Sequence, residues 1–395
     1  MTRVFIVRHA EAEGNLYRRV HGWYDSRLTT DGFRQLSCLA DRFAGEKIDA
    51  VYASDLRRTR ETAMALAGPR GLPVVSDARL REIGMGVWED RPWGEVIYRQ
   101  PDMLYAYNHD PERWKVEGSE AHRHVEERMR EAFFEIARKN RNRTVVIASH
   151  GTAIRALTRT LLGIPLEEIH SIRHSDNTAV TYVEVERAVP NVVYLGDACH
   201  VPASLSTFAK QKWWRKGGDF SEKNCWFRPL DFDTEPELYY NARLDAWRTV
   251  HGTMDDFDGE AFLTDAKACS AFSKESVRVA MVDDAPVGII QMDFQQEAAF
   301  GVGRIPFWYV MPGCRDQGYG VQMLGEAVSL CRNRGRDHLR LRVAPTNEGA
   351  IRFYTRYGFY RIGKAPGTRV PLDVMEKYIG FGEPHPVGPF GLVTV

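Results

Sequence analysis

The sequence lacks the features that direct a protein to membranes or to nucleic acid. No apolar run approaches the roughly 20 residues of a membrane-spanning helix, and no signal-peptide core precedes the first predicted strand. The formal net charge is zero, with 53 basic and 53 acidic residues, so no overall basic field attracts nucleic acid or anionic lipid. We therefore expect a cytoplasmic protein that binds neither a membrane nor nucleic acid.

Cysteine is scarce, and histidine shows no metal-binding pattern. The six cysteines include no Cys-x-x-Cys pair, which argues against a zinc site and against a disulfide framework. We expect reduced thiols and no bound metal. Several histidines lack metal-ligand spacing, so most of them are expected to be surface or core residues. These are His21, His122, His124, His170, His174 and His200.

Length and composition predict two domains. A chain of 395 residues, 44% hydrophobic and 27% charged, exceeds the usual size of one globular domain, and it contains no internal repeat. Strand-like alternation ends before His200, and Lys210–Gly218 is basic and aromatic without a regular period. We place the domains at residues 1–208 and 225–395. The segment 209–224 is interpreted as a docked linker rather than a nucleic-acid-binding surface.

Three apolar runs in the first half are followed by basic side chains. The runs are Val4–Val7, Asp49–Ala53 and Val145–Ala148. Arg8 and His9 follow the first, Arg58 follows the second and His150 follows the third. Continuous apolar runs indicate parallel strands buried on both faces, whose carboxyl ends meet at one ligand-binding edge. We predict an open, mostly parallel sheet with helices on both faces and an anion held at that edge.

Four segments carry a family resemblance. They are Arg8–Asn15, Ser54–Ala63, Leu80–Glu89 and Val145–Gly151. In this order they resemble the histidine phosphatase superfamily, in the branch that includes phosphoglycerate mutases and related phosphatases. His21–Thr29, Asp176–Val180 and Gly196–His200 are similar to further segments of that family, so the resemblance covers about residues 1–205. Ala10 and Asp90 replace commoner glycines, but neither change removes a catalytic atom.

The resemblance implies phosphomonoester hydrolysis through a phosphohistidine intermediate on His9. A phosphate dianion needs fixed positive charge around its oxygens. The implied phosphate-binding residues are Arg8, Asn15, Arg58, a protonated His150 and Gly151. His9 must attack through a neutral ring nitrogen, so we expect its other nitrogen to be held by a backbone carbonyl or a carboxylate.

The resemblance also implies that Glu82 protonates the leaving alkoxide and then accepts a proton from the attacking water. Glu89 and Glu11 are alternatives, because spacing alone distinguishes the three carboxylates. Mutase-type phosphoryl transfer is an alternative reaction. The stretch from Glu82 to His150 contains one loop and one amphipathic helix, whereas mutases of this family usually carry a longer insertion there. This favours hydrolysis.

The second half contains a glycine-rich turn between a strand and a helix. Pro312–Gly320 follows a strand predicted at Ile305–Met311, and glycines in such a turn let the backbone approach a pyrophosphate at a helix N-terminus. A strand predicted at His338–Val343 and the segment Asn347–Phe359 come next. Together these blocks resemble the GNAT superfamily of acyl-CoA N-acyltransferases over about residues 222–380. The resemblance implies a mixed α/β sheet with splayed central strands.

Acetyl-CoA, or another acyl-CoA, is the cosubstrate that this second resemblance implies. Tyr354 would protonate the departing thiolate and Asn347 would steer the pantetheine arm. The other implied contacts are the backbone of Tyr309, Val310 and Met311, the Arg315 side chain, and the amides of Gln317, Gly318, Tyr319 and Gly320. The base that deprotonates the amine stays open, with Asp293, Glu297 and a water chain as alternatives.

Two sets of candidate catalytic residues predict a bifunctional enzyme with a phosphomonoester and an amine as small-molecule substrates. The simplest hypothesis is that both domains act on one phosphorylated amine, in an order that the sequence does not fix. In an alternative hypothesis, one domain only senses phosphate ester or acyl-CoA and regulates the other. The sequence predicts no oligomeric state.

Overall fold

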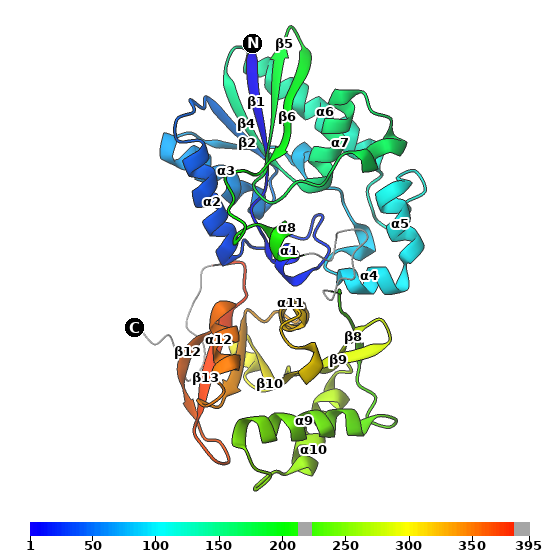
Figure 1. The fold of residues 1–395 in the computed structure, drawn as a ribbon, viewed down its shortest axis with the longest axis vertical. Coiled ribbons are helices and arrows are strands. Elements are labelled where there is room, and N and C mark those ends of the chain that lie inside the picture. The colour runs from blue at the N-terminus through cyan, green and yellow to red at the C-terminus, as the bar shows by residue number, and fades with distance from the viewer. Residues whose placement is uncertain (212–222, 383–395) are drawn as a thin grey trace. The chain divides into compact units, whose positions relative to one another are not determined.

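The computed structural model describes residues 1–211 and 223–382 and contains two compact units, Met1–Glu222 and Lys223–Val395 (Figure 1). The predicted linker at 209–224 includes residues 212–222, which lie outside the described residues. The domain bounds drawn from the sequence, and the role of the basic segment within 210–218, therefore stay predictions. Across the described residues, no helix combines the length and the apolar character needed to cross a lipid bilayer.

The first unit is built on a six-stranded sheet with the order β3-β2-β4-β1-β5-β6. The strands are β1 (Thr2–Arg8), β2 (Ala50–Ala53), β3 (Val74–Ser76), β4 (Thr144–Ser149), β5 (Val180–Glu186) and β6 (Val189–Asp197). The first four strands in this order pair in parallel, and β5 and β6 add antiparallel pairs at one side. The prediction of an open, mostly parallel sheet is confirmed.

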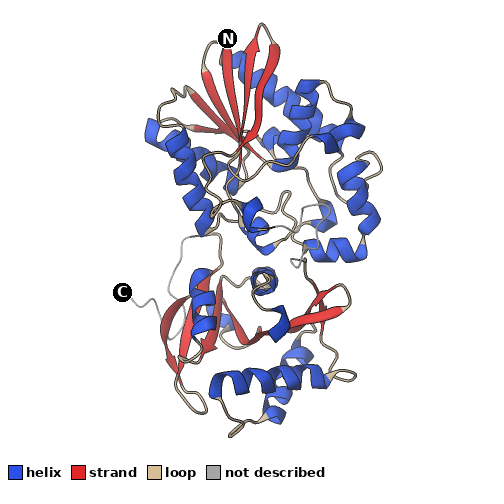
Figure 2. Ribbon diagram, viewed as in Figure 1, coloured by secondary structure: helices blue, strands red, loops and turns tan. Residues whose placement is uncertain are grey.

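Helices cover both faces of this sheet (Figure 2). The α-helices described in this unit are α1 (Glu13–Tyr17), α2 (Thr30–Arg42), α3 (Arg57–Ala67), α4 (Trp93–Arg99), α5 (Pro101–His109), α6 (His122–Lys139), α7 (Gly151–Leu162) and α8 (Thr207–Lys210). Side chains alternate along a strand, so Val4 and Ile6 of β1 pack with α6 and α7, whereas Phe5 and Val7 pack with α2 and α3. This double burial explains the continuous apolar run that opens the chain.

The second unit contains a seven-stranded sheet with the order β12-β13-β11-β10-β9-β8-β7. The strands are β7 (Trp226–Pro229), β8 (Val277–Val282), β9 (Ala285–Asp293), β10 (Val302–Val310), β11 (His338–Val343), β12 (Tyr360–Ala365) and β13 (Leu372–Tyr378). Only β10 and β11 pair in parallel, and their ladder ends at Ile305 and Leu341 although β10 continues to Val310. The two central strands separate beyond that point, as the sequence predicted.

Four helices accompany this sheet: α9 (Pro236–His251), α10 (Gly259–Phe272), α11 (Tyr319–Arg332) and α12 (Glu348–Arg356). Helices α9 and α10 share a buried apolar cluster with β8, β9 and β10. Helix α11 packs closely against β9 and β10, since a Cβ on Gly288 would lie 2.9 Å from the Met323 sulfur and one on Gly303 2.3 Å from the Cys331 sulfur.

Candidate active sites

Two parallel strands bring His9 and His150 to the same edge of the first sheet. In the register of β1 with β4, Arg8 lies opposite Ser149, so each strand ends immediately before one of these histidines. The two imidazole rings are buried, and their centroids lie 5.3 Å apart. The structure therefore places the predicted nucleophile next to the second predicted histidine.

The backbone fixes the orientation of the His9 ring. Its Nδ1 lies 2.8 Å from the carbonyl oxygen of Ala10, which can only accept a hydrogen bond, so Nδ1 carries the proton and Nε2 keeps its lone pair. Burial and the nearby charges of Arg58 and Arg8 hold the pKa of His9 well below its usual range. The ring is therefore neutral near pH 7, in the state that a nucleophile requires.

Arg8 and Arg58 supply positive charge that no described carboxylate neutralises by a direct ion pair. Arg58 is fully buried and donates to the carbonyl oxygens of Gly22 (2.7 Å) and Tyr24 (3.0 Å), and burial lowers its pKa to about 10. Arg8 donates to the carbonyl oxygen of Ser175. The Nε atoms of both arginines are buried and have no hydrogen-bond partner among the described residues. Such an arrangement favours an oxyanion ligand.

His150 differs from the expectation that it is protonated. Burial, with Arg58 and His9 close by, holds its pKa well below the usual range, so the surroundings favour the neutral ring. Both ring nitrogens are buried without a hydrogen-bond partner in the part of the chain that the structure describes. A phosphate dianion between His9 and His150 would supply the opposing charge that protonation of this ring needs.

The Glu82 carboxylate lies at the N-terminus of α7, beside the histidines. Its oxygens accept hydrogen bonds from the backbone N–H groups of Thr152 (3.0 Å), Ala153 (2.9 Å) and Ile83 (3.0 Å). A Cβ added to Gly151 would lie 3.5 Å from Arg8 Nε and 3.8 Å from Glu82 Oε2. The structure thus brings together the predicted acid and a predicted phosphate ligand.

The two alternative acids have structural partners. Glu89 accepts from the backbone N–H groups of Trp23 (2.7 Å) and Tyr24 (2.9 Å), and so holds the loop that carries them. Glu11 is 1% exposed and accepts from the hydroxyls of Thr29 (2.7 Å) and Thr207 (3.0 Å). Glu82 also accepts backbone hydrogen bonds, and what distinguishes it from these two carboxylates is its place beside Gly151, a predicted phosphate ligand.

The glycine-rich turn of the second unit leads directly into α11. Gly318 is the N-cap of this helix, with φ of 78°, a left-handed conformation that favours glycine. Gln317 Nε2 donates to the Gly313 carbonyl (2.9 Å), and Arg315 donates to the Val310 carbonyl (3.2 Å) and lies 3.5 Å from an Asp245 oxygen. The turn thus leads into the first residues of α11, Tyr319 and Gly320, whose amides are among the predicted CoA contacts.

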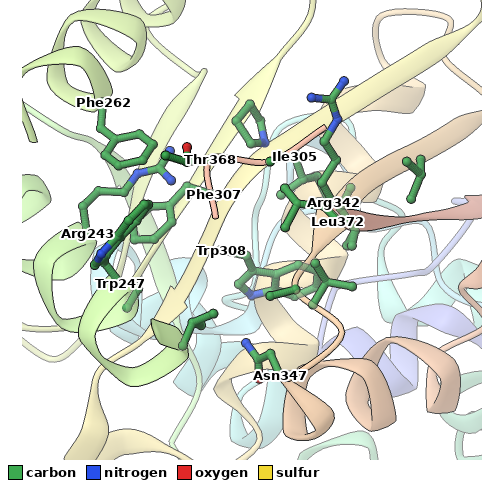
Figure 3. A pocket seen from close by; sticks show the side chains of 18 of the residues that line it. Arg243, Trp247, Phe262, Ile305, Phe307, Trp308, Arg342, Asn347, Thr368 and Leu372 are labelled. Carbon is green, nitrogen blue, oxygen red and sulfur yellow. The ribbon is translucent and has the colours of Figure 1, made fainter. Parts of the chain in front are cut away.

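A pocket of about 650 Å³ lies where β10 and β11 separate (Figure 3). Trp308, Asn347 and Tyr354 are among its lining residues. The Tyr354 ring lies 5.5 Å from Trp308 and 5.6 Å from Phe359, and burial raises the pKa of its hydroxyl. Asn347 accepts from the Ala350 N–H (3.2 Å) and caps α12. The predicted acid of acyl transfer therefore lies at a cavity and is protonated.

Of the predicted bases, only Glu297 lines this pocket, and Arg340 donates to its Oε2 at 2.5 Å. Asp293 is not among the lining residues, and its Oδ1 accepts from the Gln295 N–H (2.8 Å). Asp265 of α10 also lines the pocket and accepts from Gln291 Nε2 (2.8 Å). No sequence signal singled out Asp265, because it lies on a helix outside the motifs.

The family model of the histidine phosphatase superfamily (branch 1) matches residues 4–198. Phosphoserine phosphatase 1 of Hydrogenobacter thermophilus is 30% identical over 201 residues, which cover 51% of this chain and 95% of that protein. The chain belongs to the histidine phosphatase superfamily. A second family model, the acetyltransferase (GNAT) family, matches residues 237–359. The predicted fusion of a histidine phosphatase domain with a GNAT domain is confirmed.

Two further relatives match the histidine phosphatase domain. A Yersinia enterocolitica protein named "Probable phosphoglycerate mutase GpmB" is 34% identical over 186 residues, which cover 47% of this chain and 86% of that protein. Bacillus stearothermophilus YhfR is a solved structure with 31% identity and a TM-score of 0.50, matched over 51% of this chain and 100% of that one. The histidine phosphatase family thus includes both phosphatases and proteins named as mutases.

The sequence reasoning missed three neighbours of the histidine phosphatase site. His21, expected at the surface or in the core, has its ring centroid 5.6 Å from that of His9, and its Nε2 lies 3.3 Å from Asn15 Nδ2. Asn177 donates to the His9 carbonyl (2.9 Å), and the Arg8 guanidinium lies 5.9 Å from the Phe208 ring centre. All three come from loops or a short helix, where no periodic pattern marks a residue for the site.

Proposed function

We propose that the first domain hydrolyses phosphomonoesters through a phosphohistidine on His9. The observation that carries this proposal is the neutral His9 ring, oriented by Ala10, beside two arginines whose charge no described carboxylate pairs directly. His9 Nε2 attacks phosphorus as the bond to the leaving oxygen breaks, and Arg8 and Arg58 bind the peripheral oxygens. Asn15, Gly151 and His150 complete the proposed phosphate site.

Glu82 is the proposed proton carrier of both steps. In the first step it gives a proton to the leaving oxygen, and in the second it takes one from the water that attacks the phosphohistidine. The water oxygen bonds to phosphorus as the bond between phosphorus and His9 Nε2 breaks. Inorganic phosphate is released, and His9 Nε2 regains its lone pair. The position of Glu82 at the start of α7, next to Gly151 and Arg8, supports this role.

Mutase-type phosphoryl transfer is a second candidate, supported by the 34% identity to the Yersinia protein named as a mutase. It would use the same phosphohistidine and return the phosphoryl group to an organic acceptor. Incubation with 3-phosphoglycerate distinguishes the two reactions. A hydrolase releases inorganic phosphate, whereas a mutase produces the 2-phospho isomer.

The second domain is proposed to transfer an acyl group, with acetyl as the group to test, from acyl-CoA to an amine. The amine nitrogen attacks the thioester carbonyl, the carbon–sulfur bond breaks, and Tyr354 protonates the leaving thiolate. The proton lost by the amine goes to Glu297, to Asp265 or to water. The pocket beside Tyr354, at the splayed strands, supports this role. The backbone of Tyr309, Val310 and Met311 would pair with the pantetheine arm, because the β10–β11 ladder ends before them.

We further propose that both domains act on one small phosphorylated amine in the cytoplasm. Similarity to a protein named phosphoserine phosphatase supports this class, since phosphoserine carries both a phosphate ester and an amine. The six free cysteines support a reducing compartment. In the alternative, a regulatory protein, one domain would bind its ligand without turnover.

The test is to incubate the full chain with acetyl-CoA and a panel of phosphorylated amines, O-phosphoserine included, while phosphate and free thiol are followed together. Release of both products from one compound supports the shared substrate. Activities that need unrelated substrates would contradict it, and a domain that binds ligand without turnover would support the regulatory alternative.

A further inference from the structure

The pocket where β10 and β11 separate, which is proposed to hold the acyl acceptor, contains several arginines in its lining. Its charged lining consists of Arg243, Arg304, Arg340, Arg342 and Arg369 with Asp265 and Glu297. A neutral amine gains nothing from guanidinium groups at the pocket wall, whereas an anionic ligand can bind those that lack a close carboxylate partner. The excess positive charge therefore calls for an explanation.

Two of these arginines are neutralised within the protein. Arg340 pairs with Glu297 and with Glu376, each at 2.5 Å. Arg369 lies 3.8 Å from an Asp255 oxygen and 3.6 Å from an Asp256 oxygen. Structural ion pairs explain these side chains, and they leave little charge for a ligand.

Arg304 and Arg342 have weaker compensation. Arg304 of β10 lies opposite Arg340 of β11 in the parallel register, and Arg342 comes two residues later, so all three side chains project from one face of the sheet. The nearest carboxylate oxygen to Arg304, from Asp293, is 3.8 Å away. Arg342 has neither an ion pair nor a hydrogen bond of its side chain within residues 1–211 and 223–382. Partial burial and the charge of Arg304 lower the pKa of Arg342.

Arg243 adds a third guanidinium from α9 (Figure 3). It lies 4.0 Å from the Phe307 ring centre and 4.5 Å from that of Phe262. Its hydrogen-bond partners are neutral groups, the hydroxyl of Tyr239 (2.7 Å) and the amide oxygen of Gln291 (3.0 Å). These contacts fix its position, and the charge of Asp265, another lining residue, acts on it.

We infer that the acyl acceptor carries an oxyanion, a phosphate ester or a carboxylate, which Arg304 and Arg342 bind while its amine faces the Tyr354 end of the pocket. This inference rests on the proposed acyl transfer and narrows its substrate class. Guanidinium groups on one face suit the paired oxygens of either anion. An anion between the two arginines also relieves their mutual repulsion.

Three small amines test this inference. O-phosphoethanolamine carries a phosphate, β-alanine carries a carboxylate, and ethanolamine carries no anionic group. Acetyl transfer to each is measured by thiol release, in the His9→Ala background so that the phosphate ester survives. We expect kcat/KM for one or both anionic amines to exceed that for ethanolamine by about 10-fold or more, the scale of one charge-assisted contact. The better of the two identifies the anion.

Arg342→Gln and Arg304→Gln should each raise KM for the preferred anionic amine by about 10-fold to 100-fold. Neither substitution should change KM for ethanolamine. Arg342→Lys should restore part of the loss, because it keeps the charge. Arg248→Gln, an exposed change on α9 outside the pocket lining, is the matched control and should change neither value. The exposed Arg342 variant keeps the test decisive if the Arg304 variant is unstable.

Equal use of ethanolamine and the anionic amines would overturn the inference and leave acyl transfer intact. The same holds if both glutamine variants keep the wild-type preference. Absence of thiol release with every amine would instead count against the proposed acyl transfer, and the inference would fall with it.

Discussion

At the scale of single residues, burial and the neighbouring charge of Arg58 favour the neutral form of both His9 and His150. His9 and His150 were predictable as neighbours because each follows an apolar run of a parallel sheet. The neutral state of His150 was not, because burial beside Arg58 depends on how loops close over the edge. His21 was missed for the same reason, since only the folded loop brings it to His9.

Replacing the proposed nucleophile should separate the two activities. We expect His9→Ala to lower phosphate release by at least about 1000-fold, because the proposed phosphoryl intermediate forms on His9. Thiol release should be retained, unless the acceptor must first lose its phosphate. His170→Ala, an exposed histidine of the same domain, is the control. Comparable phosphate release by the two variants would refute the role of His9.

The effect on kcat of replacing Glu82, the proposed proton carrier, should depend on the leaving group of the substrate. Glu82→Gln cannot protonate an alkoxide, so we expect kcat for an alkyl phosphate to fall by about 100-fold or more. The fall should be smaller for p-nitrophenyl phosphate, whose leaving group needs no proton. Glu112→Gln, a surface change, serves as the control. An equal fall for both substrates would assign Glu82 a purely structural role.

At the scale of elements, strands and helices with strong patterns were predictable, whereas the contacts at their ends were not. The segment His338–Val343 is a strand with the predicted bounds, because alternation and flanking turns define it. The position of Arg315 against Asp245 could not be read from the turn sequence, since it depends on α9 packing beside β10. Asp265 lines the pocket because α10 packs against the sheet, and this contact could not be read from the local sequence either.

The close packing around Gly320, at the start of α11, leads to a prediction about acyl-CoA binding. A Cβ on Gly320 would lie 3.1 Å from the Phe353 ring, which itself packs on Trp308 with centroids 5.3 Å apart. Gly320→Ala should displace that ring and raise KM for acetyl-CoA by about 3-fold to 10-fold, the cost of modest overpacking.

Gly313→Ala is the matched control for this element, because a Cβ there would meet nothing within 4 Å. Steady-state thiol release measures both variants, and phosphate release should be normal in each. A Gly320→Ala enzyme with unchanged KM, or a Gly313→Ala enzyme with an equal increase, would argue against a tight approach of α12 to this turn.

At the scale of the whole molecule, buried neutral histidines make stability depend on pH. The pKa values of His9, His21 and His150 lie well below the usual range, and that of His122 is about 4. The unfolded chain binds protons at these positions below about pH 6.5, whereas the folded domain does not. Acidification therefore favours the unfolded state.

We expect the free energy of unfolding of the histidine phosphatase domain to fall between pH 7 and pH 5.5, by up to ~1.4 kcal/mol per pH unit for each such histidine. Denaturant titrations at several pH values measure this slope. Inorganic phosphate should oppose the loss by binding the folded site. Constant or rising stability on acidification over this range would show that these rings are already charged.

The order of the strands along the chain has a consequence for synthesis on the ribosome. All six strands of the first sheet precede residue 198, and the first strand of the second sheet begins at Trp226. Within the described residues, each sheet is formed from one continuous stretch of the chain. At ~5 to 20 residues per second, translation from residue 198 to residue 382 takes about 10 to 40 s. The amino-terminal sheet can therefore form cotranslationally, well before the second sheet has been synthesised.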